Sequence, residues 1–149
     1  MVRITQLFPQ FVNDEHNHNL MKEVTSKEIE KVLHGMKKEK IYGPDKLSSK
    51  FYIGLYNVLG KDLLWVVEES NKSGKILATF NSTFIVLVPK FRNPNHFKDF
   101  IPISLCNTIY KIMTKIISRR IKPFLYANIY VEQFGFLLGR HIHDTIGVA

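Results

Sequence analysis

The chain has 149 residues, of which 45% are hydrophobic and 23% are charged, values that fit a globular protein and argue against disorder. Its longest apolar run, Phe84–Val88, is far shorter than the roughly 20 residues that span a bilayer, and no apolar signal segment follows Met1. The single cysteine, Cys106, excludes an internal disulfide and indicates a reducing intracellular compartment, nucleus or cytoplasm.

The net charge of +8 lies entirely in the second part of the chain. Residues 1–69 hold ten basic and ten acidic residues, whereas residues 70–149 hold eleven basic and three acidic ones. This bias favours a polyanionic partner, most simply a nucleic acid. A lysine-rich surface that only keeps the protein soluble explains the same count, so charge alone leaves both interpretations open.

The N-terminal part predicts a polar start followed by helices. Residues 13–19 are polar and read as a loop or a frayed end. Thr25 and Glu28 have the spacing of a capping box, which predicts a helix over 25–39. Its apolar face recurs with helical period and consists of Ile29, Val32, Leu33 and Met36.

A turn and two further helices follow. Gly43-Pro44-Asp45 is turn material because Gly tolerates unusual backbone angles and Pro fixes one of them. Ser48 or Ser49 is expected to cap a second helix that runs through Phe51, Leu55 and Val58. A third helix is predicted from about Asp62 to Ser73, with Gly74 as its stop and with Leu63, Val66 and Val67 facing inward.

The pattern then changes to that of strands. Thr83–Val88 is rich in β-branched and aromatic residues, which predicts a buried strand ended by Pro89. Residues 100–105 look extended, with Pro102 requiring a bulge or an edge position. With turn residues at 92–95 between them, the two segments predict a hairpin that carries a long basic loop.

The strongest helical pattern covers residues 107–122, with Asn107 as a plausible cap and Pro123 as the stop. Ile109, Ile112, Met113, Ile116 and Ile117 form its apolar stripe. On another face Lys111, Lys115, Arg119 and Lys122 lie along about 16 Å of helix. These cations can track a phosphate backbone or simply face solvent. The loop cations Lys90, Arg92 and Lys98 add weight to the first interpretation.

Motifs for enzymatic chemistry are absent from the sequence. It contains no phosphate-binding glycine loop, no nucleophile elbow and no paired Cys-x-x-Cys. His16 with His18, and His141 with His143 and Asp144, lack an established ligand spacing and read as surface groups. We therefore predict no metal site and assign no catalytic residue.

Several ordered motifs resemble the start of a reverse transcriptase, closest to those of plant LINE-type non-LTR retrotransposons. Residues 81–90 (NSTFIVLVPK) resemble N-S-T-x-I-x-L-I-P-K, residues 99–107 (DFIPISLCN) resemble D-F-R-P-I-S-L-C-N, and residues 110–115 resemble Y-K-I-x-x-K. Gly43-Pro44-Asp45 resembles an upstream G-P-D element, residues 119–123 resemble N-R-L-K-P, and residues 136–144 resemble F-x-x-G-R-x-I-x-D. The likeness covers residues 24–149 and is weaker over residues 1–23.

The resemblance implies an α+β fold: an N-terminal extension over 1–23, then a partial reverse-transcriptase domain over 24–149. That domain would hold upstream helices, the fingers hairpin and a helix leading toward the palm of a right-hand polymerase, without the palm itself. In that family the fingers hold the template strand and the phosphates of the incoming nucleotide. The resemblance thus makes Lys90 a phosphate or template contact and places Gln133, Gly139 and Arg140 near the template. RNA template and DNA primer are the implied partners; no membrane partner is expected.

Two departures from the family pattern matter. The arginine of D-F-R-P-I, which contacts nucleotide phosphates, is Ile101 here. The aspartates that hold two Mg²⁺ ions belong to the palm, and the 149 residues contain no x-A-D-D. We therefore expect a truncated protein of a retroelement that is inactive alone, needs no cofactor and leaves part of the stripe at Ile109–Ile116 uncovered.

Two alternatives stay open. The chain can be a non-catalytic module that binds RNA or DNA with its basic fingers surface. It can also be a piece of a longer, active enzyme, in which case F-x-K-x-D and Y-A-D-D follow Ala149 in frame.

Overall fold

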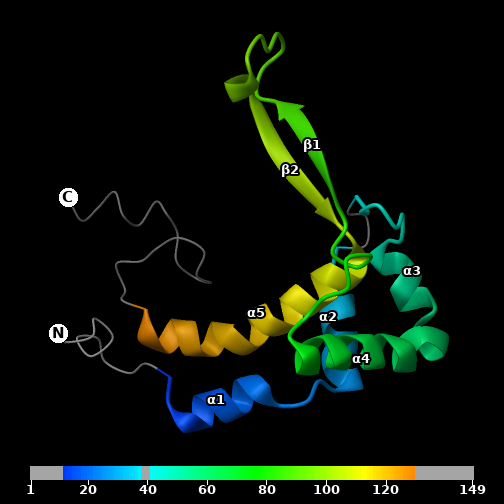
Figure 1. Cartoon of the computed structure of the whole chain (residues 1–149), viewed down its shortest axis with the longest axis vertical. Helices are drawn as coiled ribbons and strands as arrows, with labels where there is room; N and C mark the ends of the chain where they lie inside the picture. The colour runs from blue at the N-terminus through cyan, green and yellow to red at the C-terminus, as the bar shows by residue number, and fades with distance from the viewer. Residues whose placement is uncertain (1–11, 38–40, 130–149) are drawn as a thin grey trace. The chain divides into compact units, whose positions relative to one another are not determined.

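The computed structural model describes residues 12–37 and 41–129. Within these ranges it has five α-helices and one antiparallel two-stranded sheet, so the predicted α+β class is confirmed (Figure 1). The chain divides into two compact units: unit 1 combines residues 1–22 with 117–149, and unit 2 comprises residues 23–116. In the described ranges no helix has the length and apolar character needed to cross a membrane.

The first described element of unit 1 is a helix where a loop or a frayed end was predicted. Helix α1 spans Asp14–Met21, and the side chain of Asn13 accepts a hydrogen bond of 2.7 Å from the backbone N–H of His16. This capping, together with two acidic residues in the first turn, stabilises the helix although no apolar period announces it. Within the same unit, the ring of His16 meets that of Phe124 edge-on at 5.1 Å between centroids.

Unit 2 begins with helix α2, Ser26–His34, whose cap and apolar face are confirmed. The Thr25 hydroxyl accepts a hydrogen bond of 3.2 Å from the Glu28 N–H. Three residues of the predicted apolar face, Ile29, Val32 and Leu33, are buried on α2, and Met36 is buried too but lies beyond the end of the helix. The predicted end at residue 39 is wrong, because the helix stops at Gly35, a residue with little tendency to continue a helix.

The next two helices have other bounds than predicted. Helix α3 spans Ser49–Gly54 and is capped by Ser48, whose hydroxyl accepts from the Phe51 N–H at 3.3 Å. Helix α4 spans Tyr56–Ser73 and ends at Gly74 with a positive φ of 64°, as predicted. The second predicted helix is therefore divided at Leu55. Phe51, Leu55 and Val58, through which it was expected to run, are exposed, whereas Tyr52 is buried.

The core of unit 2 lies between α2, α4 and the start of α5, Thr108–Asn128. Leu63 and Val67 of α4 are buried there, with Val66 packed against them, as predicted. Ile112, Met113 and Ile116 of α5 are buried too, at 0–4% exposure, and Ile109 is partly buried, so the expectation that part of this stripe is uncovered is wrong for these three residues. Its outermost member, Ile117, is 51% exposed.

Helix α5 also passes the proline that was predicted to stop it. Pro123 lies inside the helix, which continues to Asn128. A proline removes one backbone donor but does not by itself end a helix. The Phe124 ring, next in sequence, has a partner in His16. Within unit 1, this ring contact lies in the part of α5 that continues past the proline.

The predicted hairpin is confirmed, and its predicted burial is wrong. Strand β1, Thr83–Pro89, pairs antiparallel with β2, Phe100–Cys106, in a regular register that sets Thr83 opposite Cys106 and Pro89 opposite Phe100. Every residue of β1 is exposed, because in the described structure no second layer covers the ribbon (Figure 1). Pro102 fits without a bulge because each strand of a two-stranded ribbon is an edge.

A cluster of polar contacts ties the base of the hairpin to the Gly43–Asp45 turn. The Asn107 carboxamide accepts from the Asp45 N–H at 3.1 Å and donates to the Thr79 carbonyl at 2.9 Å. The Thr108 hydroxyl donates to the Leu47 carbonyl at 2.6 Å. There is no room for a side chain at Gly43, since a Cβ at this position would lie 2.5 Å from the backbone nitrogen of Asn107. The turn and the hairpin base therefore form one packed junction.

Candidate nucleic-acid interface

The loop that closes the hairpin, residues 90–99, carries the first group of predicted contacts. Lys90, Arg92 and Lys98 are all exposed at this tip. The Lys90 ammonium donates one hydrogen bond of 2.7 Å to the Lys98 carbonyl and keeps two further N–H groups for a ligand. The structure thus brings together, on one loop, three cations that the sequence spreads over nine positions.

A single carboxylate organises this loop. Asp99 is 8% exposed, and one of its oxygens accepts from the backbone N–H groups of Asn95 and His96 at 3.0 and 2.9 Å. The backbone N–H of Lys90 also donates a hydrogen bond of 2.8 Å to the backbone carbonyl of Asp99. The backbone of residues 95–99 is therefore held in place by bonds to Asp99, and the carboxylate faces inward and not toward a ligand.

The second group of predicted contacts lies on α5. The helical spacing of Lys111, Lys115, Arg119 and Lys122 sets them on one side of the helix. The last three are exposed, whereas Lys111 is partly buried and donates to the Ile41 carbonyl at 3.3 Å. Three side chains of this face are consequently available to a ligand, and Lys111 contributes to the fold.

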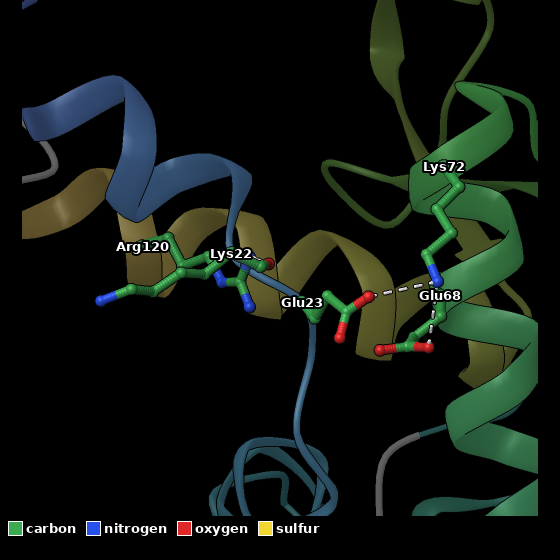
Figure 2. Close-up of polar contacts among 5 residues, drawn as sticks. All are labelled: Lys22, Glu23, Glu68, Lys72 and Arg120. Atoms are coloured by element: carbon green, nitrogen blue, oxygen red, sulfur yellow. Dashed lines mark hydrogen bonds and ion pairs between the residues drawn. The ribbon is translucent and has the colours of Figure 1, made fainter. Parts of the chain in front are cut away.

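Two other cations are engaged in protein contacts. In unit 2, the Lys72 ammonium lies 3.4 Å from a Glu23 carboxylate oxygen and 3.7 Å from a Glu68 oxygen (Figure 2). The hydrogen bond to Glu23 is the main reason why the pKa of Lys72 is raised. In unit 1, the Arg120 guanidinium donates to the carbonyls of Leu20 and Lys22 at the end of α1. Neither side chain was a predicted contact, and both serve the fold.

Acidic residues are scarce in the part of the sequence that carries the candidate cations. Residues 70–129 contain ten Lys or Arg and one acidic residue, Asp99, which is buried. In the described ranges no three His, Cys, Asp or Glu side chains are grouped as a metal ion would require. This stretch of chain therefore offers an anion many donors and no exposed carboxylate.

The strands of the hairpin are apolar on the face that holds Ile101, unlike the basic loop at the tip. The register sets Ile101 opposite Val88, and on the same face of the ribbon every large side chain is apolar. Ile101 is 47% exposed at the position where the resemblance expects a phosphate-binding arginine. The face consists of Phe84, Val86, Val88, Ile101, Ile103 and Leu105. Cations are consequently confined to the tip and are absent from this face.

The remaining predicted contacts, Gln133, Gly139 and Arg140, lie outside the described residues, as do His141, His143 and Asp144.

The tip of the hairpin also carries two aromatic residues that an analysis of charge does not identify. They are Phe91 and Phe97, which are 55% and 88% exposed. The alternation of aromatic and basic residues in Lys-Phe-Arg and His-Phe-Lys is the sequence feature that finds them.

Comparison with known proteins supports a mobile-element relationship. No family model matches the chain. The "Transposon TX1 uncharacterized 149 kDa protein" of Xenopus laevis is 30% identical over 135 residues, which cover 91% of this chain and 10% of that protein. The chain is related to a transposon protein. It spans about a tenth of the length of that relative, whose name states no activity.

Proposed function

We propose that these residues form the fingers part of a LINE-type reverse transcriptase and bind its nucleic-acid strands. The observation that carries the proposal is the distribution of charge: exposed cations at the hairpin tip and along α5, with no exposed carboxylate between residues 70 and 129. The relationship to a transposon protein and the ordered motifs support the same interpretation. RNA template and DNA primer are the proposed ligands.

The proposal assigns no catalytic residue to the chain. Two-metal nucleotidyl transfer needs a set of carboxylates around the ions. The resemblance places that set in the palm, in motifs that these 149 residues do not contain. With a homopolymer template, a primer and Mg²⁺, the chain should therefore bind nucleic acid and incorporate no nucleotide. Incorporation above a buffer control that survives repurification would contradict this division of roles.

Salt dependence of RNA binding tests the α5 face directly. If about four phosphates are neutralised, the slope of log K against log salt should be roughly −3 to −4. Replacing Lys115, Arg119 and Lys122 together by Gln preserves helix propensity and should reduce the slope by about 2–3. Lys111 is left intact because it contacts the Ile41 carbonyl.

A matched control removes the same charge elsewhere. Lys27, Lys31 and Lys61 are exposed on α2 and α4, and their joint replacement by Gln also lowers the net charge by three. If both triple variants weaken binding equally, only net charge matters and α5 is not an interface. If neither the parent chain nor the variants bind RNA at about 150 mM salt, the basic surface only faces solvent and the proposed function fails.

A further inference from the structure

We propose that Phe91 and Phe97 stack on unpaired bases of a single-stranded nucleic acid held at the hairpin tip. The inference rests on the proposed nucleic-acid binding and adds the chemical feature that the tip recognises. No motif of the resemblance includes these two residues, and both side chains are exposed. Phe97 is 88% exposed and Phe91 is 55% exposed. Burying a phenylalanine side chain normally lowers the free energy of the folded protein, so this exposure is unfavourable unless a ligand covers the rings.

The surroundings of the two rings identify the kind of partner. Phe91 lies between Lys90 and Arg92, and Phe97 precedes Lys98, so each ring has a cation beside it in sequence. An apolar protein partner would have to leave these charges without counter-ions. A single strand satisfies both groups at once, since its phosphates meet the cations and its bases expose flat faces for stacking.

Hydrogen bonds hold the backbone of the loop around Phe97 in place. Phe97 lies between His96 and Lys98, whose backbone groups bond to Asp99 and Lys90 respectively. Asp99 closes the loop through two backbone N–H groups, as described above. A fixed backbone lowers the conformational entropy that is lost on binding. The tip thus presents its aromatic rings from an ordered loop.

Two RNA strands of equal length, one with bases and one abasic, separate stacking from phosphate contact. With fluorescence anisotropy, Phe97→Ala should weaken binding of the base-bearing strand by about 5- to 160-fold, the range that base–aromatic stacking spans. It should leave both the affinity for the abasic strand and the salt slope unchanged. Phe91→Ala should act in the same direction. Trp65→Ala is the matched control, because Trp65 is an aromatic residue of α4 that is 68% exposed.

Substitutions at position 97 separate aromatic from merely apolar contact. Phe97→Tyr keeps the ring and should retain parental affinity, whereas Phe97→Leu keeps the apolar character and should bind as weakly as Phe97→Ala. Equal affinity of all position-97 variants overturns the stacking proposal and leaves phosphate binding intact. Equal loss in Phe97→Ala and Trp65→Ala overturns it as well. Absence of any salt-dependent binding by the parent chain refutes the proposed function itself, and with it the stacking.

Discussion

Replacing Asn107 by Ala should destabilise unit 2 by about 2–3 kcal/mol. Asn107 is 4% exposed and makes two hydrogen bonds, one from the Asp45 N–H and one to the Thr79 carbonyl. Loss of the Thr79 bond should cost about 1 kcal/mol, the usual net contribution of a neutral hydrogen bond. Loss of the acceptor for the partly buried Asp45 N–H should cost about 1–2 kcal/mol more, since that donor is left without a partner.

Urea unfolding followed by circular dichroism measures this change. The midpoint should fall with the slope m unchanged, because the variant alters stability and not the surface exposed on unfolding. Asn71→Ala, at an exposed position of α4, is the control and should stay within about 0.5 kcal/mol of the parent. If Asn107→Ala behaves like the control, the junction between the turn and the hairpin base contributes no stability, and the reasoning from its hydrogen bonds is refuted.

Three further results are expected. Burial, with a smaller contribution from Asp45, raises the pKa of Tyr52 to about 12, so the folded state keeps this proton above pH 10. The unfolded chain loses it first, so stability should fall by up to roughly 3 kcal/mol between pH 10 and 12, and Tyr52→Phe should flatten that fall in urea titrations at each pH. Ile101→Arg should steepen the salt slope of RNA binding by about 1 without enabling nucleotide incorporation; an unchanged slope would mean that this face of the ribbon does not meet phosphate. Joint replacement of Val86 and Ile103 by Thr should reduce self-association in analytical ultracentrifugation, whereas Val58→Thr should not; a clean monomer before substitution would contradict the expectation.

Features set by neighbouring residues could be predicted from the sequence. The Thr25 cap, the buried face of α2 and the stop at Gly74 each depend on residues within a few positions of one another. The pairing of the strands was predictable too, because two β-rich segments flank a turn. Helix α1 was predictable in principle from Asn13 and the acidic first turn, but the absence of an apolar period argued against it.

Features set by distant residues could not be predicted in this way. Asn107 was expected as a helix cap, and it does precede α5, but its carboxamide bonds to residues 62 and 28 positions away. The burial of β1 was misjudged because a run of apolar residues does not reveal whether a second layer covers it. Among the candidate contacts, charge identified the cations, whereas only the structure distinguished the exposed Lys115 from Lys111, which contacts Ile41.

The hairpin separates two kinds of surface that respond oppositely to salt. Its tip concentrates Lys90, Arg92 and Lys98, whose attraction to phosphate is screened as ionic strength rises. Its strands expose apolar side chains such as Val86 and Ile103, whose association salts such as sulfate strengthen. Weak binding at high salt can therefore reflect screening of the tip or occlusion by association of the strands. Measuring the apparent Kd for RNA at several protein concentrations and each salt level distinguishes them, because screening leaves that Kd independent of protein concentration, whereas self-association makes it rise with protein concentration.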